Sequence, residues 1–347
     1  MTSQDVARAA GVSASAVSRA FTPGASVSAD KKARILRAAT ELGYRPNVMA
    51  RAVATRRSNV VGLILFNETN RHYPEVLLAL SNAFSAVGVR IMLFLLEDDD
   101  EIDETIDHVL SYQLDGVITA APIPDGALQQ LRAARVPLLF YNRPGAEGCA
   151  SVSCDHVASG IAIARYVLAQ GHHRIGVIRA YRDSSVGSER MAGVEQELAR
   201  GGAAIVAEYR GDFDYDSGLA AVLDWEERGD VTFTALIAAN DMMAIGARDG
   251  LAHLLGRRVP NEVLVVGFDG IEASRWIGNA IPSVAQPIEQ MSLAAASMMV
   301  ERIADPDRLA ERRLFAGRLS QPSTRDLNSD RGWNPNHSPN EGCNAGN

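Results

Sequence analysis

The first residues of the chain place polar side chains at helical spacing in a pattern that could read nucleic acid. Residues 5–21, DVARAAGVSASAVSRAF, put alanine and serine ahead of Arg19. Small side chains let a helix backbone approach a major groove closely. The residues predicted to face such a groove are therefore Ala14, Ser15, Ser18 and Arg19.

Two short helices joined by a tight turn would position these side chains. Thr2 and Asp5 are three residues apart, the spacing of a capping box at a helix start. Gly11 permits a positive-φ turn, and Ser13 can cap the helix that follows. The pattern predicts a helix-turn-helix. The side chains expected to face inward are Val6, Ala9, Ala10, Val17 and Ala20.

A third helix should complete this bundle, from about residue 29 to residue 42, with Ser28 as its cap. Its expected buried face comprises Ile35, Leu36, Ala39 and Leu42. The alternative is a small helical bundle without a DNA function, because such patterns also occur by chance.

The charge distribution favours DNA over that alternative. Residues 1–57 contain ten Lys and Arg against three Asp and Glu, a net charge of +7. The whole chain is −8, which leaves −15 for the remainder. Only the amino-terminal part therefore suits a phosphate backbone.

Composition limits the remaining classes. With 347 residues, 47% hydrophobic and 22% charged, the chain can form a small domain and a large one. No apolar run is long enough for a membrane helix and the start does not resemble a signal peptide, so we expect a cytoplasmic protein with no membrane partner. The three cysteines lack metal spacing, and no nucleophile-elbow, phosphate-loop or zinc motif is present. We therefore expect no catalytic residues, no metal and no cofactor.

From residue 59 onward, β-branched and aliphatic runs alternate with helical stretches. The runs are NVVGLILF, VRIMLFLL, DGVITA, VPLLFY, RIGVIRA, TALIAA and EVLVVGFD. This alternation predicts an α/β core of parallel, doubly wound sheets, in two groups of strands separated near residues 153–160. Ligands of such folds bind at the carboxyl ends of the strands, so a cleft between two subdomains is the expected pocket.

The amino-terminal motif, together with residues 27–64 (VSADKKARILRAATELGYRPNVMARAVATRRSNVVGLI), resembles the LacI/GalR family of bacterial transcription regulators. The resemblance extends to about residue 324. It implies a helix-turn-helix headpiece (1–46), a hinge helix and linker (47–58) and a core like that of periplasmic binding proteins (59–326). The implied N-subdomain is about 59–157 and 287–315, and the C-subdomain about 158–286 and 316–326.

The resemblance implies that Ala14, Ser15, Ser18 and Arg19 lie on a base-reading recognition helix, with Arg19 as the guanine reader through two parallel donors. It also implies DNA contacts beyond this helix. Ser13, Thr22 and Ser28 would hold phosphates, and Thr2 begins the motif. A hinge helix at residues 47–55 would insert Val53 into the minor groove, where the family usually has leucine, so a shorter wedge should unstack the bases less completely. Residues 56–58 look like an ordinary linker, which is the alternative for this whole segment. The remaining hinge residues in this predicted set are Asn47, Ala50 and Ala54.

Effector residues are implied at strand ends. Arg190 matches a ligand-gripping arginine, Asp269 an aspartate that accepts from sugar hydroxyls, and Gln286 a glutamine at a crossover. For Asn240, capping of a helix and ligand contact are equally good interpretations. The aromatic candidates, each with a core-packing or interface alternative, are Tyr73, Phe213 and Trp276.

Other polar residues near strand ends are expected to be structural. Asp155 and His156 should serve as helix caps, and His172 and His173 should lie in a turn. The chain departs from the family pattern before the second crossover and at Gln321-Pro322. The family pattern therefore does not define the ligand specificity or the pairing of the last strand. Residues 327–347 are rich in Asn, Pro and Gly and should form a disordered tail without leucine heptads, so we expect a homodimer.

The sequence thus predicts a transcriptional regulator, most consistent with a repressor, whose partners are operator DNA, a second copy of the chain and a small effector. A sugar, sugar acid or sugar phosphate fits the strand-end residues. An activator or dual regulator of the same family is the main alternative. A periplasmic solute-binding protein would share the core, but the headpiece argues against it.

Overall fold

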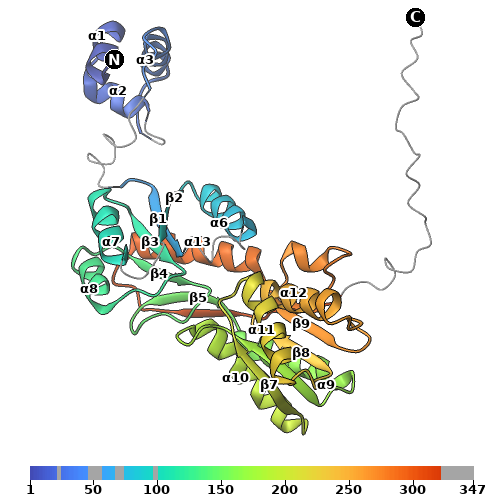
Figure 1. Ribbon diagram of the computed structural model, residues 1–347. Coiled ribbons are helices and arrows are strands. Elements are labelled where there is room, and N and C mark those ends of the chain that lie inside the picture. The colour runs from blue at the N-terminus through green and yellow to red at the C-terminus, as the bar shows by residue number, and fades with distance from the viewer. Residues whose placement is uncertain (22–24, 46–56, 67–73, 97–100, 322–347) are drawn as a thin grey trace, which may run out of the picture. The chain divides into compact units, whose positions relative to one another are not determined.

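A computed structural model describes residues 1–21, 25–45, 57–66, 74–96 and 101–321 (Figure 1). The predictions for Thr22, for the hinge residues Asn47, Ala50, Val53 and Ala54, for Tyr73 and for the 327–347 tail lie outside these residues. The chain forms two compact units, residues 1–153 with 288–313, and residues 154–287 with 314–347. The chain crosses between the two units three times.

Three helices form the headpiece at the start of the first unit: α1 (Ser3–Ala10), α2 (Ala14–Ala20) and α3 (Ala29–Glu41). The predicted capping box is present, because the Thr2 hydroxyl accepts from the Asp5 amide and the Asp5 carboxylate accepts from the Thr2 amide. Gly11 ends α1 with φ +63°, and the Ser13 hydroxyl accepts from the Ala16 amide. The helix-turn-helix prediction is confirmed in its local details.

The headpiece core differs from the predicted one at four positions. Ala7 is buried and Ala9 exposed, and Ala38 is buried where Leu36 is 40% exposed. In each helix the two residues lie two positions apart, about half a helical turn, and one apolar stripe in a short helix cannot decide which of them is buried. Ser28 occupies the cap position of α3, but its side chain makes no capping hydrogen bond. The complete buried set is Val6, Ala7, Ala10, Val17, Ala20, Ile35, Ala38 and Ala39.

The remainder of the first unit is a six-stranded sheet with helices. Its strand order is β11 (Arg312–Phe315), β5 (Ala150–Cys154), β4 (Leu138–Tyr141), β3 (Gly116–Thr119), β1 (Val60–Phe66) and β2 (Arg90–Leu96). The pairs from β5 to β2 are parallel. Helix α6 (Pro74–Ala86) lies beside α13 (Ile288–Ala304), and α7 (Ile102–Ser111) beside α8 (Asp125–Ala133) (Figure 1).

The second unit repeats this plan. Its strand order is β12 (Arg318–Ser320), β10 (Ser283–Ala285), β9 (Leu264–Asp269), β8 (Ala235–Ala238), β6 (Arg174–Arg179) and β7 (Ala204–Arg210). All pairs are parallel except β10 with β12. The order reverses at β6, which lies between β7 and β8, so the carboxyl ends beside β6 are the expected ligand edge of a doubly wound sheet.

Four helices cover this second sheet: α9 (His156–Ala169), α10 (Ser185–Arg200), α11 (Tyr215–Arg228) and α12 (Asp241–Asp249). Helices α9 and α10 pack closely because Gly160 and Gly193 face each other's backbones. A Cβ atom on Gly193 would overlap the carbonyl oxygen of Val157, and one on Gly160 that of Arg190. The two glycines therefore fix the position of the helix that carries Arg190.

Candidate functional site

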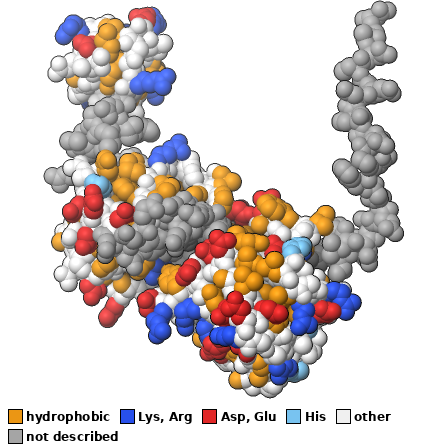
Figure 2. Space-filling model, viewed as in Figure 1, with side chains coloured by type: hydrophobic (Ala, Val, Ile, Leu, Met, Phe, Trp, Pro, Cys, Tyr) orange, Lys and Arg blue, Asp and Glu red, His pale blue; other side chains and the backbone are white. Residues whose placement is uncertain are grey.

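The exposed face of α2 carries the predicted base-reading residues. Ala14, Ser15, Ser18 and Arg19 are all exposed, whereas Val17 and Ala20 on the same helix are buried. Figure 2 shows further lysine and arginine side chains on the surface of the headpiece. The helix therefore offers one small, polar face that ends in a guanidinium.

The predicted phosphate contact Ser13 and the predicted DNA-binding residue Thr2 also make contacts within the headpiece. The Ser13 hydroxyl caps α2 and lies 2.9 Å from the Ser15 hydroxyl, and the Thr2 hydroxyl bonds the Asp5 carboxylate. Ser28 is exposed at the start of α3. A helix start leaves some backbone amides without partners within the helix, so the starts of α2 and α3 are suitable for phosphate contact.

Three predicted effector residues converge at the carboxyl edge of the second unit's sheet. Asp269 is the last residue of β9, Gln286 follows β10, and Arg190 lies on α10. The Arg190 Nη2 donates to Asp269 Oδ1 at 2.5 Å, and the Gln286 amide donates to the same oxygen at 2.6 Å. The ion pair is buried, with side-chain exposures of 2% for arginine and 4% for aspartate.

Further contacts fix the Arg190 guanidinium. Its Nη1 donates to the Ala239 carbonyl at 2.6 Å, and its Nε donates to His156 Nδ1 at 3.4 Å. The guanidinium carbon also lies 5.1 Å from the centre of the Phe268 ring. A cation over an aromatic face is stabilised by the ring quadrupole. Residues at the ends of β8 and β9 and at the start of α9 thus hold the Arg190 side chain in place.

The His156 contact corrects one sequence prediction. Asp155, as expected, is the cap of α9, and its carboxylate accepts from the Ala158 amide at 2.9 Å. His156 is instead the first residue of the helix, buried beside Arg190. Helix caps are readable from local spacing, but this contact joins residues 34 positions apart.

Asp269 also has an unusual backbone. Its φ is +104°, a region that residues with a side chain rarely adopt. Such conformations persist where surrounding contacts fix them, and they concentrate at binding sites. Here the Asp269 backbone carbonyl accepts from the Gln286 backbone amide at 3.1 Å. The Asp269 carboxylate accepts from the side chains of Arg190 and Gln286.

A second carboxylate, Asp241, lies fully buried close to this cluster. Its oxygens accept from the Ser283 hydroxyl at 2.6 Å and from the Ile271 amide at 2.9 Å. Burial raises the pKa of Asp241 to about 7, and the negative charge of Asp269 adds to the increase. Asp241 directly follows Asn240, one of the predicted effector residues, and has no exposed surface.

Asn240 is the cap of α12, because its side-chain oxygen accepts from the Met243 amide at 2.9 Å. Its side-chain amide donates to the Phe213 carbonyl at 2.7 Å. These two bonds support the capping interpretation of Asn240. Phe213 itself has φ +63° and contacts the edge of the Tyr181 ring, with centroids 5.7 Å apart.

Trp276 is not brought into these contacts. It follows the short helix η3 (Glu272–Arg275), and 57% of its surface is exposed. Within the described part of the chain, no group of three His, Cys, Asp or Glu residues could hold a metal ion. No described helix has the length and apolar character needed to cross a membrane.

Comparisons with known proteins agree with this architecture. Residues 2–47 match the family model for bacterial regulatory proteins of the lacI family, and residues 164–321 match the periplasmic binding protein-like domain. The transcriptional regulator CelR of Thermobifida fusca is 32% identical over 86% of this chain and 90% of its own. The regulator AscG of Escherichia coli K12 is 29% identical over 91% and 95%.

Solved structures show the same fold. A CelR–cellobiose complex matches with a TM-score of 0.70 and 29% identity, and a Lac repressor bound to ONPG with 0.82 and 25%. Each comparison covers 92% of this chain and 98% of the other. These relatives are transcriptional regulators rather than enzymes, in agreement with the sequence. The chain therefore belongs to the lacI family of bacterial regulatory proteins and is a DNA-binding transcriptional regulator.

Proposed function

We propose that this regulator is a repressor that binds a pseudo-palindromic operator as a homodimer, and that a neutral polyhydroxylated effector alters its operator affinity. The effector contacts are Arg190, Asp269 and Gln286. The single observation that carries this proposal is the buried convergence of Arg190 and Gln286 on one oxygen of Asp269.

The charges of this cluster favour a neutral ligand over an anionic one. Arg190 is the cation in contact with Asp269, and Asp241 adds a second buried carboxyl group nearby. The cluster therefore has no excess positive charge to offset the desolvation of a phosphate or carboxylate. A sugar hydroxyl can accept from Arg190 or Gln286 and donate to Asp269, so it can replace these internal bonds. The relative CelR has been solved with cellobiose, which supports a sugar ligand.

The DNA-binding part is the headpiece, residues 1–46, and residues 47–58 form the hinge. Arg19 is the proposed guanine reader, and Ala14, Ser15 and Ser18 let α2 approach the bases. Thr2, Ser13, Thr22 and Ser28 are proposed phosphate contacts, and Asn47, Ala50, Val53 and Ala54 are proposed hinge contacts. Binding to chromosomal operators places the protein in the cytoplasm.

Effector control requires that the ligand bind two states of the protein with different affinities. A homodimer matches the two-fold symmetry of a pseudo-palindromic operator, because each protomer contacts one half-site. A change that the two protomers share therefore alters the contacts at both half-sites. Tyr73, Phe213 and Trp276 are proposed aromatic contacts to the apolar face of the sugar. Core residues 59–326 carry the effector site and the dimer contacts.

The test begins with selection of genomic fragments on the purified full-length protein. We expect one palindromic motif to be enriched, and its position over a promoter to indicate repression. Operator affinity is then measured by fluorescence anisotropy against a panel of neutral sugars, sugar acids and sugar phosphates. At least one neutral sugar should change the affinity about tenfold or more.

Two variants assign this response to the cluster. Gln286→Leu should lose the sugar response while operator binding without sugar is kept, and Glu262→Gln, which removes a partly buried carboxylate of the same unit outside the cluster, should behave like the parent. Failure to enrich any palindrome would refute the DNA part of the proposal. A response to charged sugars alone, or one that Gln286→Leu leaves intact, would refute the effector part.

A further inference from the structure

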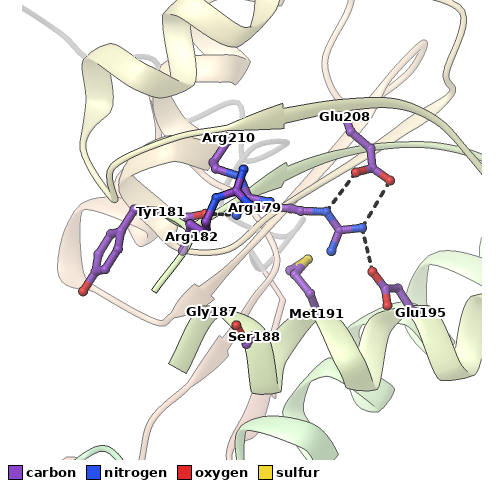
Figure 3. A pocket seen from close by; sticks show the side chains of 10 residues that line it. Arg179, Tyr181, Arg182, Gly187, Ser188, Met191, Glu195, Glu208 and Arg210 are labelled. Carbon is purple, nitrogen blue, oxygen red and sulfur yellow. Dashed lines mark hydrogen bonds and ion pairs between the residues drawn. The ribbon is translucent and has the colours of Figure 1, made fainter. Parts of the chain in front are cut away.

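A polar pocket of about 370 Å³ lies in the second unit, and none of the Arg190, Asp269 and Gln286 cluster lines it (Figure 3). Its walls come from the end of β6 and the residues that follow, from residues 187–195 of α10 and from the end of β7. This volume is in the range of small-molecule sites, which run from roughly 300 to 1,000 Å³.

One arginine of this pocket, Arg179, binds two carboxylates of the protein itself. Arg179 donates to both Glu208 oxygens at 2.9 and 3.2 Å and forms an ion pair with Glu195 at 2.6 Å. The hydrogen bonds to Glu208 raise the pKa of Arg179, and the same contacts lower the pKa of Glu208. These three residues form a fixed wall with a net charge of −1.

Two further arginines line the same pocket from the ends of neighbouring strands. Arg210 ends β7 and donates one bond, from Nη1 to the Ala180 carbonyl at 3.1 Å, and Arg182 lies just beyond β6. Both are exposed, and neither guanidinium forms an ion pair with a described residue. With the Arg179 wall, the pocket lining carries a net charge of +1 on a chain of net charge −8.

We propose that this pocket binds a small metabolite through an oxyanion, either a carboxylate or a phosphate ester, held by Arg182 and Arg210. Guanidinium groups bind such oxyanions with two parallel, charge-assisted hydrogen bonds. The Ser188 hydroxyl on α10 supplies one more donor at the pocket wall. This site is separate from the effector site proposed above and does not depend on it, because the two sites share no residue and differ in charge.

The experiment is isothermal titration calorimetry on the full-length protein with inorganic phosphate, glucose 6-phosphate, gluconate, citrate and neutral glucose. At least one oxyanion should bind, and Arg182→Ala should weaken its binding by about tenfold or more. The double variant Arg182→Ala with Arg210→Ala should abolish it. The matched control is Arg257→Ala, which removes an exposed arginine of the same unit outside the pocket.

The pattern of outcomes identifies the ligand chemistry. Binding of phosphate compounds alone assigns a phosphate site, and binding of gluconate or citrate alone assigns a carboxylate site. Arg182→Ala is the decisive variant, because the Arg182 side chain makes no hydrogen bond or ion pair with a described residue, so the melting temperature of the variant should match that of the parent. The proposal is overturned if no oxyanion binds, or if Arg257→Ala weakens binding as much as Arg182→Ala.

Discussion

Arg190 and Asp269 form a buried ion pair between α10 and the end of β9, although 79 positions separate them in the chain. Neither residue is more than 5% exposed. A buried pair of this kind contributes little net stability while intact, but loss of one partner leaves a charge without compensation. The pair therefore couples the position of α10 to the strand ends.

Removal of either partner should destabilise the protein strongly. We expect Arg190→Met and Asp269→Leu each to lower the free energy of unfolding by about 3–5 kcal/mol. The double variant should lose clearly less than the sum, because neither charge is then left alone. Denaturant unfolding of the full-length chain measures all four proteins. Additive losses, within about 0.5 kcal/mol, would show that the two side chains do not interact.

Asp241 should make stability depend on pH. Its pKa of about 7 in the folded chain lies above the ordinary value of 3.8, so the native state binds more protons than the unfolded state between these values. Stability from this group is therefore highest at the acid end, falls as the pH rises toward 7, and levels off above it; the loss is at most about 4 kcal/mol.

Asp241→Asn should remove this dependence, because the amide stays neutral at every pH tested. The measurement is the difference in melting temperature between variant and parent from pH 5 to pH 8. We expect the difference to move in favour of the variant as the pH rises. Glu262→Gln is the control, since hydrogen bonds from Arg258 lower the pKa of Glu262 below its ordinary value of 4.5, so its pH dependence lies below the range tested and its difference from the parent should stay nearly constant.

Gly193→Ala should be among the most damaging small substitutions in the second unit. The added methyl group would overlap the Val157 carbonyl, so α9 and α10 would have to separate, at a cost of about 1–3 kcal/mol or more. Gly126→Ala in α8 is the control, because nothing lies within 4 Å of its added methyl group. That control should be neutral or stabilising by up to about 1 kcal/mol. Equal melting temperatures for the two variants would contradict the close packing.

Arg19→Ala should reduce both operator affinity and sequence preference. Loss of one bidentate guanine contact costs about 1–3 kcal/mol of discrimination at a single base pair. Arg37→Ala removes an exposed arginine of α3 and should weaken binding equally on all sequences, if at all. Competition binding against single-base operator variants separates the two effects. An unchanged base preference in Arg19→Ala would exclude this residue as the reader.

Local sequence determined much of the fold. The Thr2 and Asp5 spacing, Gly11 and Ser13 set the helix ends of the headpiece, because caps act within three or four residues. The seven apolar runs marked seven of the parallel strands, since strands buried on both faces need continuous hydrophobic sequence. Arg190, Asp269 and Gln286 were identified as candidates from the sequence alone.

Tertiary structure decided the rest. Strands β5, β7, β10, β11 and β12 were not predicted because they are serine-rich, lie at a sheet edge or have only three residues, so their pairing partners rather than their patterns define them. The shared Asp269 oxygen, the His156 contact and the Arg179 wall join residues 16 to 79 positions apart. Short-range spacing sets helix ends and strand periods, but only the packing of distant segments brings such side chains within hydrogen-bond distance.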